Sequence, residues 1–118
     1  MSHNLDARLE KLHQLCPRQM KAFQCLNEAV TEEGTLSAKT KSLIAIGISA
    51  AIRCEPCLRR HVRSAMDLGS TSDEILEACG VAIHMGGGPT LAYCALYALD
   101  ELESILKSRQ EISDKGIS

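Results

Sequence analysis

Apolar residues recur every three or four positions near the start of the chain, which is the spacing of an amphipathic helix. A first stripe lies between Leu5 and Cys16 and stops at Pro17, a residue that suits the first turn of a following helix. A second stripe begins at Met20 and runs as far as Gly34, a residue type that ends helices. The pattern therefore predicts two helices at the N-terminus.

A third helix is expected to begin at Ser37, a favourable N-cap residue. Residues 46–52 are apolar on all sides of this helix, so we expect it to run through the centre of the fold. The helix should end before Pro56, because a proline disfavours helical geometry at the preceding Glu55 and then suits the first turn of a fourth helix. Gly69 closes that fourth helix.

A fifth helix is predicted by the capping-box pattern of Thr71 and Glu74, and it should end at the glycines 86–88. From Pro89 onward the apolar residues again repeat every three or four positions, which predicts a last helix. The remaining residues, 108–118, are polar, and we expect them to fray.

The composition agrees with this pattern. The chain has 118 residues, of which 45% are hydrophobic but only 3% aromatic, with no Trp. Such a core has to be built from Leu, Ile, Ala, Met and Cys, which favours closely packed helices. We expect an all-α single domain over residues 1–118 with about six packed helices: N-terminal helices in 1–35, a core in 36–107 and the polar tail 108–118.

The charges exclude several classes of partner. Thirteen basic and fifteen acidic residues are interleaved and give a net charge of −2. Nucleic-acid and membrane-surface binding need a clustered basic stripe, so we expect neither partner. The most apolar stretch, residues 43–52, is about half the roughly 20 residues that a bilayer crossing needs. Residues 1–6 carry no secretory signal, and we expect a cytoplasmic protein with mostly reduced thiols.

One segment has a pattern of reactive side chains: Cys54, Glu55, Pro56 and Cys57, followed after three residues by His61. Cys54 lies just before the fourth helix and Cys57 in its first turn, and such a pair is close enough to form a disulfide. The free N–H groups of that turn stabilise a thiolate, so Cys57 should be a nucleophile. His61 lies one turn later on the same face and can accept or return the thiol proton. These two cysteines and the histidine are the predicted catalytic residues.

Other interpretations of the cysteines remain open. A structural zinc ion could bind the same three side chains, with Cys79, Cys94 or His84 as a fourth ligand, but no second C-x-x-C supports it. A thioredoxin-like fold is disfavoured, because its motif needs a strand before the helix. Cys79, Cys94 and Cys16 otherwise resemble inert core thiols, and Cys25 stays unassigned. His84 fits a helix end, where it interacts with the dipole, or the edge of the redox pocket.

The Cys54-to-His61 motif is accompanied by the runs 36–41 (LSAKTK), 73–78 (DEILEA) and 86–89 (GGGP). With these features the chain resembles the carboxymuconolactone decarboxylase family, specifically its alkylhydroperoxidase D-like branch. The resemblance implies an all-α fold that assembles into homotrimers or homohexamers. It also implies a peroxidase or disulfide-reductase activity in which the two cysteines cycle, because members that decarboxylate lactones generally lack the pair.

The chain departs from that branch at Ser42. Twelve residues before the first motif cysteine, the redox branch usually has a glutamate that orients the histidine in a proton relay. A hydroxyl can hold a water molecule or the imidazole, but it cannot stabilise an imidazolium as a carboxylate does. Glu55 and Glu77 are candidate replacements, and His84 is a further pocket candidate.

The leading hypothesis is therefore a thiol-dependent oxidoreductase. Cys57 attacks a hydroperoxide or exchanges with a disulfide, and Cys54 closes the intramolecular disulfide. The order of attack by the two cysteines stays open. A dithiol or a protein electron donor then reduces the pair, and no bound cofactor is needed because the cysteines store both electrons. The alternatives are a carboxymuconolactone decarboxylase-like lyase with His61 as general base, and a non-catalytic oligomeric module that binds zinc or senses redox state.

Overall fold

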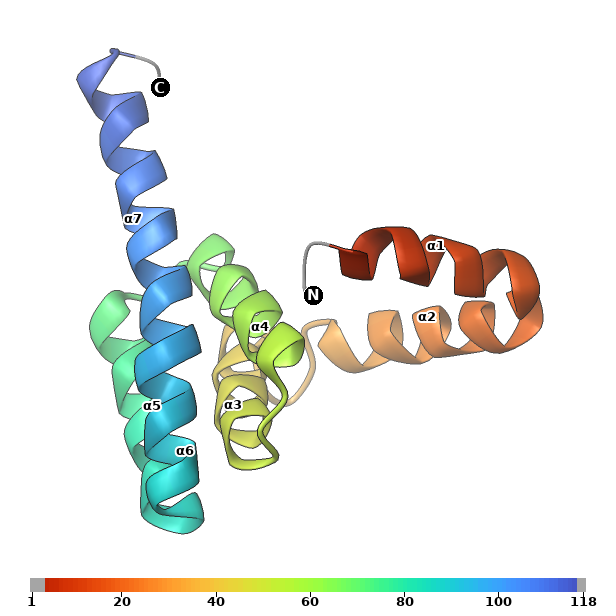
Figure 1. Ribbon diagram of the computed structural model, residues 1–118, viewed down its shortest axis with the longest axis horizontal. Helices are drawn as coiled ribbons and strands as arrows, with labels where there is room; N and C mark the ends of the chain where they lie inside the picture. The colour runs from red at the N-terminus through yellow and green to blue at the C-terminus, as the bar shows by residue number, and fades with distance from the viewer. Residues whose placement is uncertain (1–3, 117–118) are drawn as a thin grey trace. The chain divides into compact units, whose positions relative to one another are not determined.

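The computed structural model describes residues 4–116, and within this range the chain is helical without a β-strand (Figure 1). The elements are α1 (Leu5–Leu15), α2 (Pro17–Thr31), α3 (Ala38–Ala51), α4 (Glu55–Asp67), α5 (Ser72–Gly86), α6 (Gly88–Tyr93), the π-helical segment η2 (Cys94–Ala98) and α7 (Leu99–Asp114). The all-α prediction is confirmed. Since α6, η2 and α7 follow one another without a loop, they correspond to the single last helix expected from the sequence.

The chain divides into two compact units between Ser37 and Ala38. The first unit contains α1 and α2, which pack on each other, and Pro17 begins α2 as the pattern predicted. Neither helix contains a buried residue. The apolar stripe of α2, which includes Phe23 and Leu26, therefore stays exposed to solvent in the single chain.

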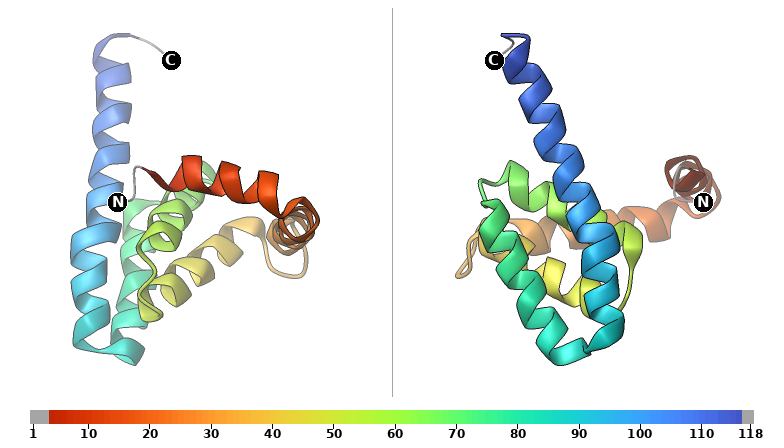
Figure 2. Two further views of the ribbon diagram at one scale, coloured as in Figure 1. Left: turned by 45° about the vertical axis from the view of Figure 1, so that its right-hand side comes forward. Right: turned by 60° about the vertical axis from the view of Figure 1, so that its left-hand side comes forward.

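The second unit holds the hydrophobic core. Helix α3 packs against α4 and α5, and α6, η2 and α7 together lie against α4 and α5 (Figure 2). The core side chains with no exposed surface are aliphatic, without an aromatic ring: Ile46, Ala50, Leu58, Val62, Ala65 and Ile75. Such side chains let the helices approach closely, in agreement with the composition.

Two local signals set the ends of these helices as expected. The Thr71 hydroxyl accepts a hydrogen bond from the Glu74 N–H at 3.1 Å, and the Glu74 carboxylate accepts one from the Thr71 N–H at 2.9 Å. This capping box begins α5. Gly69 ends α4 with a φ of 92°, a backbone conformation that glycine adopts without steric cost.

The expectation that α3 runs through the centre of the fold is wrong for the single chain. Its buried residues lie on one side of the helix: Ser42, Ile46, Ser49 and Ala50. On other sides Ile44 is 46% and Ile48 56% exposed. The physical reason is that α4 and α5 cover only part of the helix surface.

The last helix also differs from the expectation. The residues from 108 onward were expected to fray, but α7 continues to Asp114. The Arg109 guanidinium donates a hydrogen bond to the Met66 carbonyl at 3.4 Å, and Gln110 donates one to Asp114 at 2.8 Å. These contacts favour a further helical turn, while residues 117–118 of the predicted tail lie outside the described part of the chain. None of the described helices is long and apolar enough to cross a membrane.

Candidate functional site

The loop between α3 and α4 places the first motif cysteine. Arg53 has a φ of 59° and its N–H donates to the Ala50 carbonyl at 3.2 Å, while the Cys54 N–H donates to the Ser49 carbonyl at 3.0 Å. This bond pair is a Schellman motif, which turns the chain sharply at the end of α3. Cys54 then becomes the N-cap of α4, and its carbonyl accepts the Leu58 N–H at 2.9 Å.

The motif cysteines form a disulfide. Cys57 is the third residue of α4, and its Cα lies 5.3 Å from that of Cys54. When the bond is reduced, both sulfur atoms lie at the helix N-terminus, where unpaired N–H groups and the positive end of the dipole favour a thiolate. The arrangement can store two electrons and release them by thiol exchange.

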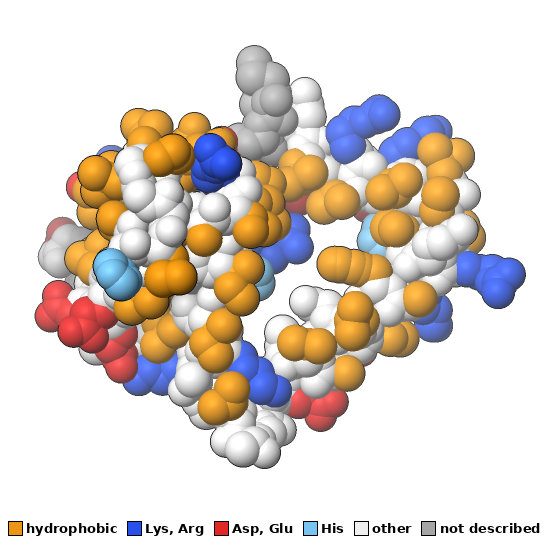
Figure 3. All heavy atoms as spheres, turned by 90° about the horizontal axis from the view of Figure 1, so that it is seen from below, with side chains coloured by type: hydrophobic (Ala, Val, Ile, Leu, Met, Phe, Trp, Pro, Cys, Tyr) orange, Lys and Arg blue, Asp and Glu red, His pale blue; other side chains and the backbone are white. Residues whose placement is uncertain are grey.

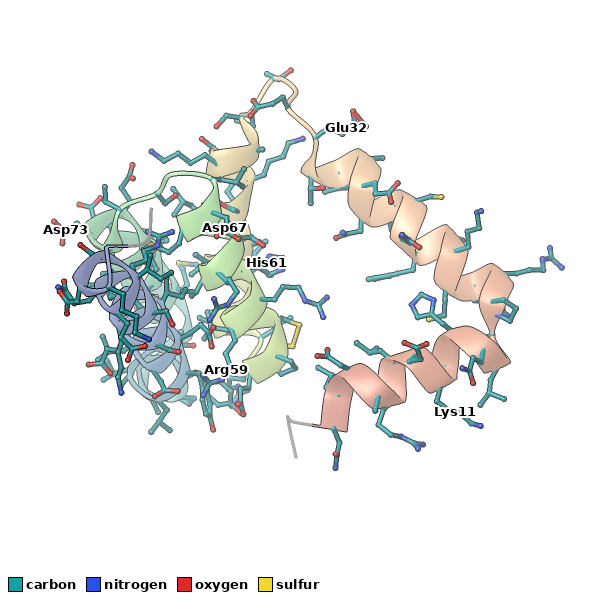
Figure 4. The ribbon with its side chains drawn as sticks, turned by 90° about the horizontal axis from the view of Figure 1, so that it is seen from above. Lys11, Glu32, Arg59, His61, Asp67 and Asp73 are labelled. Carbon is teal, nitrogen blue, oxygen red and sulfur yellow. A yellow bond between two sulfur atoms is a disulfide. The ribbon has the colours of Figure 1, made fainter. Side chains whose placement is uncertain are left out.

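His61 lies one helical turn after Cys57 on α4 and is half-buried (Figure 4). Burial lowers the pKa of His61 below its ordinary value of 6.5, and the neighbouring Arg60 cation lowers this pKa further. The neutral imidazole therefore predominates at pH 7, and this is the form that can accept a proton from a thiol.

The structure gives Ser42 and Glu55 definite partners. Ser42 is 7% exposed, and its hydroxyl donates a hydrogen bond to the Lys39 carbonyl at 2.6 Å within α3. Its hydrogen is used by the backbone, so its oxygen can act toward another group only as an acceptor. The Glu55 carboxylate accepts a hydrogen bond from Arg59 at 3.0 Å. Glu55 is thus held by a cation on its own helix.

The remaining candidates lie on α5. Glu77 and His84 are exposed, and His84 lies in the last turn of that helix, as its helix-end interpretation predicted.

Two other cysteines form a buried pair. Cys79 and Cys94 are buried, so the interpretation as core thiols is confirmed for both, whereas Cys16 is half-buried and Cys25 exposed. Burial raises the pKa of the Cys79 thiol to about 12, with a smaller contribution from the adjacent Cys94. Burial also raises the pKa of Cys94. Thiols that hold their protons so firmly are poor nucleophiles.

Sequence reasoning missed an ionic cluster around Arg59. Its guanidinium binds the carboxylates of Glu55, Asp100 and Glu101 and lies over the Tyr97 ring, 5.5 Å from the ring centroid. Burial alone would lower the pKa of Arg59, but the three carboxylates outweigh it and raise this pKa. The spacing of four residues between Glu55 and Arg59 signals one of these pairs, while the other partners come from more than 35 residues away.

An apolar groove runs between α3 and α5 and has a volume of about 450 Å³. Its lining is Thr40, Leu43, Ile44, Gly47, Ile48, Ala51, Ala78, Val81, Ala82 and Met85. Exposed apolar side chains are also widespread on the face shown in Figure 3. Exposed apolar surface of this kind is typical of binding or assembly surfaces.

The alternative zinc site is not assembled within residues 4–116. No three side chains of His, Cys, Asp or Glu are placed there to hold a metal ion. The candidate fourth ligands Cys79 and Cys94 lie instead in the hydrophobic core.

Comparisons with known sequences point to one family. The sequence profile of the carboxymuconolactone decarboxylase family matches residues 17–100. An uncharacterized protein from the cox locus of Paracoccus denitrificans is 37% identical over 84 residues, which cover 70% of this chain and 76% of that protein. An uncharacterized protein of Cupriavidus necator is 31% identical over 102 residues, covering 80% and 90% of the two chains.

Solved structures show the same fold. A carboxymuconolactone decarboxylase family protein from Legionella pneumophila superimposes with a TM-score of 0.81 at 37% identity, over 86% of this chain and 90% of that one. A family member from Thermotoga maritima, for which involvement in an antioxidative response has been suggested, gives a TM-score of 0.74 at 30% identity. It covers 79% of this chain and 95% of its own length.

Proposed function

The chain belongs to the carboxymuconolactone decarboxylase family, and we propose that it is a thiol-dependent oxidoreductase of the alkylhydroperoxidase type. The observation that carries the proposal is the Cys54–Cys57 disulfide at the start of α4. His61, a neutral base one turn further along the helix, supports it. The antioxidative role suggested for the Thermotoga maritima relative is in line with this chemistry.

In the oxidative half of the cycle, the Cys57 thiolate attacks an oxygen of a hydroperoxide. The O–O bond breaks, Cys57 becomes a sulfenic acid, and an alcohol leaves after the proton held by His61 reaches its oxygen. The Cys54 sulfur then attacks Cys57, the disulfide forms and water leaves. The sum converts two thiols and one hydroperoxide into a disulfide, an alcohol and water.

In the reductive half, a dithiol or a protein electron donor restores both thiols. Its thiolate attacks the disulfide, forms a mixed disulfide and is displaced by its own second thiol. The two cysteines hold both electrons throughout, so the cycle as proposed requires no bound cofactor. A cytoplasmic location would supply donors of this kind.

The proton relay is expected to differ from one that contains a carboxylate. Glu55 is bound by Arg59, and Ser42 offers an oxygen that can accept a hydrogen bond but cannot neutralise an imidazolium. We therefore propose that His61 works largely without a carboxylate partner. We therefore expect the reaction with hydroperoxide to be slower than in a relay that contains a carboxylate.

Titration of free thiols tests the function. Addition of hydroperoxide to the reduced protein should remove two thiols per chain, and Cys57→Ser should abolish this loss. Cys54→Ser should lose one thiol and accumulate a sulfenic acid at Cys57. The matched control is Cys25→Ser, which removes an exposed cysteine outside the motif and should still lose two. Equal losses in wild type and Cys57→Ser, or no loss in either, would contradict the proposal.

The family name also raises a lyase reaction, with His61 as the general base on a small lactone. Alkylation of the reduced cysteines separates the two functions. A lyase would keep turning over lactone after alkylation, whereas the proposed peroxidase would lose its response to hydroperoxide.

We also propose that the chain assembles into a homotrimer or homohexamer. The support is the apolar groove between α3 and α5 and the apolar stripe of α2, both exposed in the single chain. Burial of such surface stabilises an assembly by roughly 25 cal/mol for each Å² removed from water.

A further inference from the structure

We propose that Arg59 is a positioning residue for the cysteine pair. In this inference, Arg59 holds the first turn of α4 against η2 and α7, and so keeps the sulfur atoms of Cys54 and Cys57 within bonding reach while both are thiols. The inference rests on the proposed dithiol cycle, but its test needs no hydroperoxide.

The contacts of Arg59 reach into the motif itself. Glu55 lies between the two cysteines, and its carboxylate accepts the Arg59 Nε–H at 3.0 Å. On the other side, Arg59 Nη1 lies 2.9 Å from Asp100 and 3.2 Å from Glu101 at the start of α7. A residue inside the C-x-x-C motif is thus tied through one guanidinium to a helix more than 40 residues away.

The surroundings favour a fixed guanidinium. Arg59 is 27% and Glu101 13% exposed, so this pair is screened less by solvent than a surface ion pair. The Arg59 guanidinium also lies over the ring of Tyr97, which packs edge-on against Tyr93 with ring centroids 5.0 Å apart. A planar fork with several donors can satisfy all these partners at once, and a lysine ammonium cannot.

The first turn of α4 needs such support because its N-cap is a cysteine. Helices are normally capped by Ser, Thr, Asp or Asn, whose side chains accept a free N–H of the first turn. Cys54 makes no side-chain capping bond. In the oxidised protein the disulfide holds the turn together. Reduction removes this covalent link, and in the inference the Glu55–Arg59 contact then helps to hold the motif.

The stability of the disulfide depends on how often the two sulfur atoms meet in the reduced protein. A fixed first turn raises the effective concentration of one thiol near the other, and a frayed turn lowers it. Substitutions that weaken the contacts of Arg59 should therefore make the disulfide easier to reduce.

Arg63 provides a matched control on the same helix. It lies one turn after Arg59 and binds the same Glu101, with Nε at 3.0 Å from the carboxylate. Its ion pair is with Glu101 rather than Glu55, and it is more exposed than Arg59. Replacement of Arg63 thus disturbs the ion pair with α7 while leaving the link to the motif in place.

The test measures the equilibrium of the full-length protein with glutathione. Protein dithiol and oxidised glutathione exchange to give protein disulfide and two reduced glutathione molecules, so atoms and electrons balance. Arg59→Lys keeps the charge and should lower this equilibrium constant about tenfold, or about 30 mV in reduction potential. Arg63→Lys should change it less than twofold. Glu55→Gln should also weaken the disulfide, and combined with Arg59→Lys the effects should be less than additive.

The inference would be overturned if the equilibrium constants of Arg59→Lys and Glu55→Gln both stayed within twofold of the wild-type value. Equal changes of this constant in Arg59→Lys and Arg63→Lys would also overturn it. Denaturation curves show whether Arg59→Lys keeps its fold. If it does not, the equilibrium constant of Glu55→Gln alone tests the inference. A wild type that exchanges with glutathione but ignores hydroperoxide would remove the proposed peroxidase function and leave the role of Arg59 standing.

Discussion

Arg53 ends α3 in the same backbone conformation in which Gly69 ends α4. Their φ angles are 59° and 92°. In both turns the N–H of this residue donates to the carbonyl three residues earlier, and the next N–H donates to the carbonyl five residues earlier. Only one of the two turns has the glycine that this conformation favours. The turn before Cys54 therefore holds a non-glycine residue at a conformational cost.

Arg53→Gly is expected to stabilise the protein by about 0.5–1 kcal/mol. A side chain in the left-handed region costs roughly 1–2 kcal/mol, and the greater entropy of glycine in the unfolded chain offsets part of the gain. Denaturant midpoints at one fixed protein concentration measure the change. Arg53→Ala removes the charge but keeps the Cβ, so it should show no such gain.

Gly69→Ala is the reverse experiment and should cost about 1 kcal/mol. A Cβ at this position would meet no atom within 4 Å, so the loss would be conformational rather than steric. Stabilisation by both Arg53→Ala and Arg53→Gly would show that charge, and not backbone conformation, sets the cost at residue 53.

The pKa of His61 should respond to Arg60. Burial and then the Arg60 cation lower the pKa of His61, so the folded protein binds this proton more weakly than the unfolded chain. The contribution of neutral His61 to the free energy of unfolding is therefore fully present above pH 6.5, and it is lost as the pH falls through the lowered pKa. Arg60→Gln should raise this pKa and move the acid limb of the thiol-oxidation rate upward.

NMR titration of the His61 ring protons measures this change directly. Lys107→Gln removes an exposed cation on α7 and serves as the control, for which the His61 titration should be unchanged. An unchanged His61 pKa in Arg60→Gln would rule out the Arg60 contribution and leave burial as its cause.

A carboxylate at residue 42 should accelerate the proposed reaction. In Ser42→Glu the carboxylate could stabilise the imidazolium of His61, so thiol oxidation by hydroperoxide should be at least tenfold faster at pH 7, on the scale of general acid–base effects. The buried charge should cost about 2 kcal/mol of stability. Stopped-flow measurement of the thiol loss gives the rate.

Ser42→Ala should change that rate less than threefold, roughly 0.7 kcal/mol or less in barrier height, because its hydroxyl already donates to the Lys39 carbonyl. Ser49→Ala, a second buried serine two turns along α3, controls for effects on packing. A Ser42→Ala variant tenfold slower than Ser49→Ala would assign the hydroxyl a direct part in proton transfer.

Local chemistry explains which features could be predicted from the sequence. Pro17 and the Thr71–Glu74 capping box mark helix ends because they act on backbone groups within four residues. The spacing of Cys54 and Cys57 predicts a disulfide for the same reason. In each case the interacting groups are neighbours in the chain, so their pattern carries the geometry.

Features that depend on distant residues could not be predicted. Asp100 and Glu101 look like surface acids in the sequence, and only the packing of α7 on α4 brings them to Arg59. The extension of α7 beyond residue 108 similarly includes a contact of Arg109 with α4. The apolar run of α3 predicts covered surfaces, but a hydrophobic pattern does not tell whether the cover comes from the same chain.

The cysteines should differ widely in reactivity. Iodoacetamide at pH 8 should modify exposed Cys25 rapidly in the oxidised native protein and leave Cys79 and Cys94 unmodified, because burial raises both of their pKa values. Mass spectrometry of peptides locates the labels. Reduction before labelling should add Cys54 and Cys57, and unfolding should expose the rest. Rapid native labelling of Cys79 would contradict its place in the core.

The groove between α3 and α5 makes the assembly testable by one substitution. Ile48 lines this groove, and a glutamate there would place a charge in an apolar contact. If the groove is an assembly surface, Ile48→Glu should weaken association at least a hundredfold, which corresponds to about 2.7 kcal/mol. Analytical ultracentrifugation across a range of concentrations measures this. Ile112→Glu, at an exposed apolar residue of α7 outside the groove, should assemble as the wild type does. A wild type that stays monomeric at every concentration, or an Ile48→Glu variant that assembles normally, would show that the groove is not where copies of the chain meet.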